Sequence, residues 1–253
     1  MRRIKLIVAY DGTEYSGWQI QPEAPTIEMY LDKAIHELTG ENVHVTGASR
    51  TDAGVHAYGN VAVFDTESTI PGDRFTFALN RFLPDSIVIQ DSWEVSGDFH
   101  PRHCNTRKTY EYRILNTAVP LPQKRNFTWH VAGSIDIDKM REAAAYIVGE
   151  HDFKSFCCVR TQAESTVRTI YSLEVLQEGR EIIIRIKGNG FLYNMVRIIT
   201  GTLIQVGKGR FKPEYVKQML EAKDRTVAGQ TAPPQGLTLV GIEYVDNDDA
   251  RVV

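Results

Sequence analysis

The chain has 253 residues, of which 42% are hydrophobic and 24% charged, with a formal net charge of −3. This composition is typical of a globular protein with one large or two modest domains. No apolar run reaches 18 residues, so we expect no membrane span. The three cysteines, two of them adjacent (Cys157 and Cys158), cannot form a disulfide framework and favour a reducing cytoplasm.

The first hundred residues predict the order βαββαβ. Residues 3–10 alternate as a strand, and Lys5 interrupts their apolar character, which argues against a signal peptide. A helix follows, with Thr26 as its N-cap and Gly40 closing it. The other expected elements are strands at 43–49 and 58–66, a helix near 72–82 and a strand near 86–94.

A similar order returns from residue 107. The expected elements are a strand from 107 with Tyr110, Tyr112 and Ile114 on one face, a helix near 138–148, two strands that meet at Glu178-Gly179, helices at 191–206 and from Pro213, and a strand at 237–245. Two such units in tandem predict an α+β fold of two ferredoxin-like units with mainly antiparallel sheets. We place the units at 1–100 and 101–253, with a linker near 96–106 and a ligand cleft between the halves.

Positive charge is concentrated in two segments. Residues 102–125 contain six Lys or Arg and a single acid, Glu111, and residues 186–212 contain five Lys or Arg and no acid. Together they carry +10, which leaves −13 for the rest of the chain. Such asymmetry can direct a positive field toward a polyanion.

The stretch TGASRTDAGVHA, residues 46–57, combines Asp52 with Arg50 in a run of small residues. Flanking apolar runs indicate a loop that leaves a strand. Small neighbours let a ligand approach the carboxylate closely. The alternative is structural: Asp52 makes an Asx-turn and Gly54 supplies a positive φ.

The helix at 191–206 is apolar on nearly every side, yet Arg197 lies in its middle. A buried guanidinium needs a carboxylate partner, for which Asp52 is our candidate. Alternatively, Arg197 extends along its aliphatic stem to the surface.

Three weaker signals stay open or are set aside. His100-x-x-His103-Cys104 lacks a second ligand pair with zinc spacing, so we predict no metal site. The segment from Lys187 to Tyr193 resembles an RNP1 element but lacks its first aromatic residue. Tyr110 is either a core residue or a platform on which a base stacks.

Four motifs together resemble the tRNA pseudouridine synthase A family: GASRTDAGVHA, RKTYEYRI, GNGFLYNMVRIITGTL and AKDRT…PPQGLTLVGIEY. The resemblance runs from Ile4 to Tyr244 in the family's order. The family usually has Gln where Asn60 stands and Asn where Ile198 stands. Both positions are peripheral to the groups that carry the chemistry.

The resemblance implies a role for five residues. Asp52 matches the essential nucleophilic aspartate, and Tyr110 matches the tyrosine that stacks on the target base. Arg197 matches the arginine that pairs with the aspartate, and Arg50 a basic residue that displaces the target nucleotide. Leu237 matches an apolar contact to the uracil.

The resemblance also implies an isomerase that converts uridine to pseudouridine at positions 38, 39 and 40 in the anticodon stem-loop of tRNA. It implies a cytoplasmic homodimer without metal or organic cofactor. Two other classes remain: an RNA-binding module without catalysis, and a ferredoxin-like structural or small-ligand protein. Whether Asp52 attacks the sugar or the base ring stays open.

Overall fold

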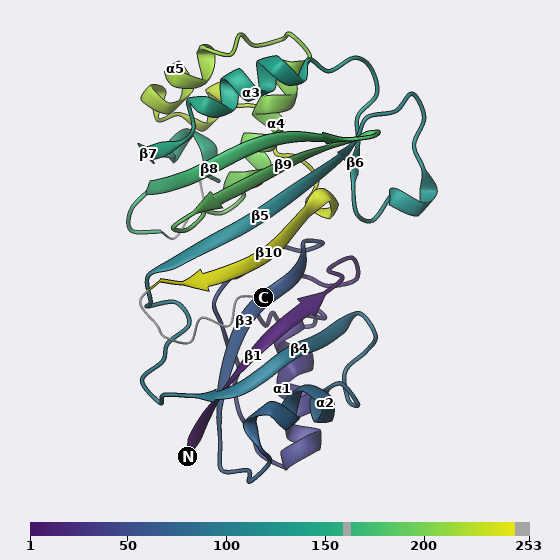
Figure 1. Ribbon diagram of the computed structural model, residues 1–253, viewed down its shortest axis with the longest axis vertical. Helices are drawn as coiled ribbons and strands as arrows, with labels where there is room; N and C mark the ends of the chain where they lie inside the picture. Colours follow the sequence, from purple (N-terminus) through teal and green to yellow (C-terminus); the bar gives the residue numbers. More distant parts are fainter. Residues whose placement is uncertain (159–162, 246–253) are drawn as a thin grey trace. The chain divides into compact units, whose positions relative to one another are not determined.

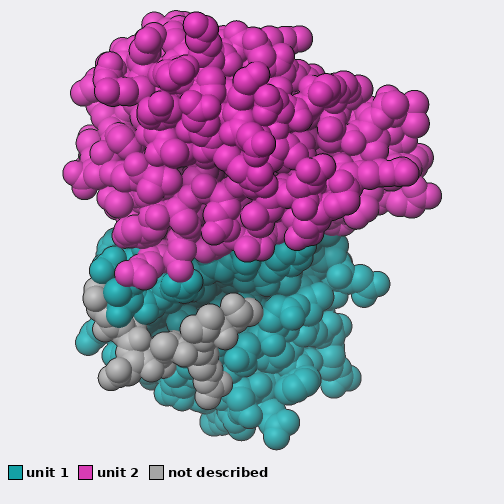
Figure 2. Space-filling view, turned by 45° about the horizontal axis from the view of Figure 1, so that its top comes forward, with its two compact units in different colours: residues 1–106, 239–253 teal, residues 107–238 magenta. Residues whose placement is uncertain are grey.

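The computed structural model describes residues 1–158 and 163–245, and the chain forms two compact units (Figure 2). Unit 1 comprises Met1–Thr106 and Leu239–Val253, and unit 2 comprises Arg107–Thr238. This division differs from the expected 1–100 and 101–253, because the chain returns to unit 1 for its last strand. A strand that pairs with a partner far back in the sequence cannot be assigned by position along the chain.

Unit 1 is built on an antiparallel sheet with helices on one side (Figure 1). Its strand order is β4 (Ile87–Val95), β1 (Arg2–Tyr10), β3 (His56–Thr66) and β10 (Leu237–Tyr244), and the short β2 (Thr46–Gly47) pairs with β3. Helices α1 (Ile27–Thr39) and α2 (Phe75–Leu79) contact each other, and a 3-10 turn, Gly72–Arg74, precedes α2.

Two predicted elements of unit 1 are shorter than expected, for visible reasons. The strand predicted at 43–49 reduces to β2, because the amide of Val45 donates to the carboxylate of Asp32 on α1, 2.8 Å away. The helix predicted near 72–82 ends as α2 before Asn80. The side chain of Asn80 instead bonds the backbone of Ile89 in both directions, at 2.9 and 2.8 Å.

A buried cation joins three strands and a loop of unit 1. Lys5 is only 2% exposed, and its Nζ lies 4.5 Å from the ring centroid of Tyr244 and 4.8 Å from those of Trp93 and Phe99. Aromatic faces attract a cation through their quadrupole, so these rings hold the ammonium group in the core. Tyr244 ends β10, so this cluster attaches the last strand to β1.

In unit 2 four strands lie side by side, and Figure 1 shows three helices gathered on one side of them. The order is β5 (Thr106–Leu115), β9 (Glu181–Gly188), β8 (Val167–Glu178) and β7 (Gly149–Asp152), all antiparallel, and β6 (Trp129–His130) runs parallel to β5. The helices are α3 (Ile137–Ala145), α4 (Met195–Gly207) and α5 (Tyr215–Ala222). The remaining 3-10 turns are Pro122–Lys124, Lys154–Phe156, Arg225–Val227 and Pro234–Gly236.

The strand pairing confirms the predicted α+β class with mainly antiparallel strands. The expected turn at Glu178-Gly179 joins β8 to β9, and Gly179 has the positive φ of 59° that such a turn favours. The assignment of both units as ferredoxin-like remains a prediction. No helix within the described ranges is long and apolar enough to cross a membrane.

Candidate active site

Asp52 lies half-buried in the loop between β2 and β3 of unit 1. The backbone closes a turn directly after it, because the amide of Val55 donates to the carbonyl of Asp52 at 3.1 Å. Gly54 supplies a φ of 76° inside that turn, as the structural alternative for this motif requires. The backbone geometry therefore explains why Gly54 stands at this position.

The segment that follows β1 packs against this loop without room for additional side-chain atoms. A Cβ at Gly17 would lie 2.6 Å from the carbonyl oxygen of Thr51, and a Cβ at Gly47 would overlap the indole ring of Trp18. The amide of Trp18 also donates to the Thr51 carbonyl at 3.1 Å. The small residues of the motif therefore serve close backbone packing, which holds the loop in one position.

Two buried polar residues of the loop are attached to the sheet. The hydroxyls of Thr51 and Tyr10 share a hydrogen bond of 2.8 Å, and the side-chain Nδ2 of Asn60 donates to the carbonyl of Ser49 at 2.9 Å. Ser49 and Thr51 are each 7% exposed, whereas Arg50 between them is exposed. Buried anchors thus alternate with the charged residues of the motif, which places the charges on the outside of the loop.

Arg197 lies half-buried in α4 of unit 2 and is held by specific polar contacts. Its Nη1 donates to Oδ1 of Asn194 at 2.7 Å, and its Nε donates to the carbonyl of Ala232 at 2.8 Å. In return, the amide of Ala232 donates to the carbonyl of Arg197 at 3.1 Å. These contacts fix the guanidinium against the Asn194 side chain and the backbone at Ala232.

The segment at 229–232 reaches α4 because both partners are small where they meet. A Cβ at Gly201 would overlap the carbonyl of Gln230, and the amide of Gly229 donates to the hydroxyl of Thr202 at 2.9 Å. Sequence reasoning missed this segment. The available signal was Gly201 within an otherwise apolar helix, which indicates a close backbone approach.

Helix α4 begins at Met195, later than the predicted residue 191, because Asn194 adopts a left-handed conformation with φ 63°. The residues before it are therefore free of the helix. Phe191, one of them, packs edge-to-face on Tyr110 with ring centroids 5.2 Å apart at 82°. Tyr110 is 7% exposed on β5 and lies opposite Ile186 of β9.

Leu237 is 6% exposed and begins β10, directly after the 3-10 turn at Pro234–Gly236. A Cβ at Gly236 would lie 2.6 Å from the ring of Tyr112, whose hydroxyl donates to the carbonyl of Pro233 at 2.7 Å. Burial raises the pKa of Tyr112 far above its usual range, so this hydroxyl stays protonated. Of the five predicted site residues, Asp52 and Arg50 lie in unit 1, and Tyr110, Arg197 and Leu237 lie in unit 2.

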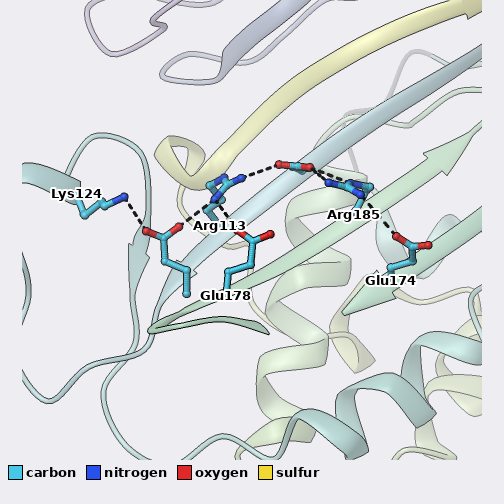
Figure 3. Close-up of polar contacts among 7 residues, drawn as sticks. Arg113, Lys124, Glu174, Glu178 and Arg185 are labelled. Carbon is cyan, nitrogen blue, oxygen red and sulfur yellow. Dashed lines mark hydrogen bonds and ion pairs between the residues drawn. The ribbon is translucent and has the colours of Figure 1, made fainter. Parts of the chain in front are cut away.

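Two basic residues of the segment at 102–125, Arg113 and Lys124, are already neutralised on one sheet face of unit 2 (Figure 3). We call this surface the ion-pair face; it comprises Glu111, Arg113, Lys124, Glu174, Glu178, Glu181 and Arg185. Arg113 lies 3.2 Å from Glu111 and 3.1 Å from Glu181, and Arg185 lies 2.6 Å from Glu111. The charge count of 102–125 therefore overstates the positive charge available to a ligand.

His100 and His103 stack their rings with centroids 3.8 Å apart and only 12° between planes. Burial lowers the pKa of His100, and the neighbouring His103 and Arg102 lower it further. In the parts of the chain that the structure describes, no three or more His, Cys, Asp or Glu side chains form a group that could hold a metal ion.

Known proteins resemble this chain over nearly its whole length. Residues 6–103 and 143–245 match the model of a family described as tRNA pseudouridine synthase. The chain is 51% identical to tRNA pseudouridine synthase A of Ruminiclostridium cellulolyticum and 48% identical to that of Thermoanaerobacter pseudethanolicus. It is also 48% identical to tRNA pseudouridine synthase A 2 of Clostridium perfringens. Each match covers 96% of this chain and 100% of the relative.

Proposed function

The chain belongs to the tRNA pseudouridine synthase family and is an isomerase that acts on uridine in tRNA, and we propose that Asp52 is its nucleophile. The observation that carries this proposal is the construction of the loop at 46–57. Ser49 and Thr51 of this loop are buried and hydrogen-bonded, and the packing at Gly47 leaves no space for a larger residue. The carboxylate of Asp52 stays half-exposed. A rigid loop that presents one carboxylate suits attack on a bound substrate.

The reaction needs a group that can take and release the ribose or the base. The bond from N1 of uracil to C1′ breaks, the base turns, and a bond forms from C5 to C1′. The proton at C5 leaves and N1 gains one, so the reaction involves no net oxidation. An ionised carboxylate serves either as a covalent nucleophile or as the counterion of a sugar cation.

The other roles follow from the resemblance and are part of the proposal. Arg197 pairs with Asp52 and keeps the carboxylate ionised, because an adjacent cation favours the charged form. Tyr110 stacks on the uracil, which must leave the helical stem to be reached. Leu237 contacts the base, and Arg50 displaces the target nucleotide.

Substrate and assembly are proposed on the same basis. The resemblance favours uridines at positions 38, 39 and 40 in the anticodon stem-loop. It also favours a cytoplasmic homodimer that works without metal or organic cofactor. Isomerisation of a single nucleotide needs only acid–base and nucleophilic groups, and Asp52 supplies the nucleophile.

The decisive experiment incubates the protein with an unmodified tRNA transcript and maps pseudouridine along it. We expect product within positions 38–40 for the wild type. Binding without product would favour an RNA-binding module, and the absence of both would favour a structural or small-ligand protein. Either result would overturn the proposal.

A further inference from the structure

The segment before β5 carries an arginine to the loop that holds Asp52. The backbone of this segment is fixed, because Nη1 of Arg3 donates to the carbonyl of Phe99 at 2.9 Å and the hydroxyl of Tyr244 donates to that of Pro101 at 3.1 Å. From this fixed backbone the next residue, Arg102, extends to Gly47. Its Nε donates to the Gly47 carbonyl at 2.7 Å.

The same bond leaves the outer edge of the guanidinium available. Among the described residues, neither terminal nitrogen of Arg102 has a hydrogen bond or ion pair, and Arg50 has no such partner for its side chain. Both side chains belong to exposed residues of unit 1. Arg50 in the loop and Arg102 beside it thus have no carboxylate among the described residues to neutralise them.

The electrostatic setting of Arg102 agrees with this geometry. Partial burial lowers the pKa of Arg102, and the positive charge of nearby Arg50 lowers it further. Glu28 opposes the shift from a distance, while its own carboxylate accepts the amide of Ile20 at 3.0 Å. An anion placed between the two guanidinium groups would relieve their repulsion.

We propose that Arg102 binds a phosphodiester group of the tRNA beside Arg50. The Nε bond to Gly47 sets the plane of the guanidinium, and the two terminal nitrogens form a fork that matches two phosphate oxygens. Because Gly47 begins the loop that presents Asp52, the bound phosphate would set the distance between the target nucleotide and the carboxylate. The inference rests on the proposed function, since it takes tRNA as the ligand.

Ethylation interference on tRNA tests this site directly. Ethylated phosphates lose their charge, so those that block binding identify the contacts that the protein makes. Binding is measured in the Asp52→Asn background, where turnover does not interfere. The matched control is Arg81→Gln, which removes the charge of another exposed arginine of unit 1 without a described side-chain partner.

We expect Arg102→Gln to remove the interference at one phosphate and to weaken binding about tenfold, as for the loss of a charged hydrogen bond. The slope of log affinity against log salt should fall by about 0.7–0.9, the value for one phosphate contact. Arg81→Gln should keep both the interference at that phosphate and the wild-type salt slope. An unchanged interference pattern and slope for Arg102→Gln would overturn the proposal, even if turnover fell, because a loop-positioning role alone predicts that combination.

A second variant covers the case in which Arg102→Gln does not fold. Arg102→Lys keeps the charge but not the planar fork, so the salt slope should stay near the wild-type value while interference at the same phosphate weakens. Interference of wild-type strength at every phosphate would contradict the fork. If the wild type forms pseudouridine and these variants bind like it, the inference fails and the proposed function stands.

Discussion

The arginines of two surfaces differ in whether a neighbouring carboxylate neutralises them. On the ion-pair face of unit 2, Arg113 and Arg185 share the carboxylate of Glu111, which is only 6% exposed. Beside the Asp52 loop of unit 1, Arg50 and Arg102 have no such partner among the described residues. Residue counts along the sequence treat these arginines as equal. The comparison indicates that one surface stabilises the fold and the other is built to receive an anion.

The largest effect should come from the carboxylate beside the unpaired arginines. Asp52→Asn should lower pseudouridine formation by roughly a thousandfold or more, because an amide is a far weaker nucleophile. Affinity for tRNA should stay near that of the wild type. Asp73→Asn, at an exposed carboxylate elsewhere in unit 1, is the control and should keep full activity. Comparable turnover in both variants would remove Asp52 from the reaction.

The next largest effect is expected for a variant of Arg197. It tests whether Arg197 has a carboxylate partner, as the arginines of the ion-pair face do. Arg197→Met preserves volume but removes the charge, so it should abolish activity. It should also destabilise the fold by somewhat less than the roughly 3–5 kcal/mol known for fully buried pairs, since Arg197 is only half-buried.

Urea unfolding of the wild type, Arg197→Met, Asp52→Asn and the double variant measures this coupling. If the two side chains meet, adding Asp52→Asn to Arg197→Met removes an isolated charge, and the double variant should be more stable than Arg197→Met alone. Strictly additive changes in the free energy of unfolding would show that the side chains of Arg197 and Asp52 do not interact.

A smaller effect is expected on the ion-pair face itself. Glu111→Gln removes the charge that Arg113 and Arg185 share and should lower the free energy of unfolding by about 1–3 kcal/mol. Glu174→Gln removes an exposed carboxylate 4.0 Å from Arg185 and should change the free energy of unfolding by less than about 0.5 kcal/mol. Activity per folded molecule should be unchanged in both variants. A large loss of activity in Glu111→Gln would mean that this face also serves the substrate.

A smaller effect is expected on salt dependence, which compares the ion-paired Lys124 with Lys108 and Arg125, two other cations of the segment at 102–125. Affinity for tRNA should fall with added salt, and charge reversal at Lys108 or Arg125 should flatten that dependence by about one phosphate contact without changing the modified position. Lys124→Gln should leave the slope nearly unchanged, because Lys124 is already paired with Glu181 at 2.8 Å. A salt-insensitive dissociation constant would contradict the electrostatic part of the proposal.

The smallest expected effect is the contribution of Glu181 to the pH dependence of stability. Burial alone would raise the pKa of Glu181, but hydrogen bonds from Lys124 and Arg113 outweigh it and hold the pKa below its usual range. A depressed folded-state pKa gives stability above the unfolded pKa of Glu, which is lost as pH falls through the folded value. Unfolding midpoints measured from pH 7 down to pH 3 should therefore fall less steeply for Glu181→Gln. Parallel curves would exclude this contribution.

Local patterns predicted much of the fold because they report on burial. The stripe of α1 is buried at Ile27, Leu31, Ala34 and Ile35, and Gly40 ends that helix with φ 76°. The same reasoning placed a charged residue in the middle of an apolar α4. It could not find Ala232 as a contact of Arg197, since that contact joins residues 35 apart in the sequence through close backbone packing.

The Asp52 motif shows the same limit from another side. Its small residues were predicted to admit a ligand, yet Gly47 serves the packing of Trp18, a residue of an earlier loop. Periodicity carries no information about such partners. Charge counting failed similarly for Arg113 and Lys124, whose carboxylate partner Glu181 lies on another strand.

The return of β10 to unit 1 has a consequence for synthesis on the ribosome. Residues 1–106 emerge long before Leu237–Tyr244, so until those residues are made the edge of β3 away from β1 is paired with the two-residue β2 but not with β10, and Lys5 lacks one of its three aromatic rings. An unpaired strand edge invites wrong pairing or chaperone binding during that interval. Because β3 follows the Asp52 loop directly, the unit that holds this loop reaches its final form only after Leu237–Tyr244 have been made.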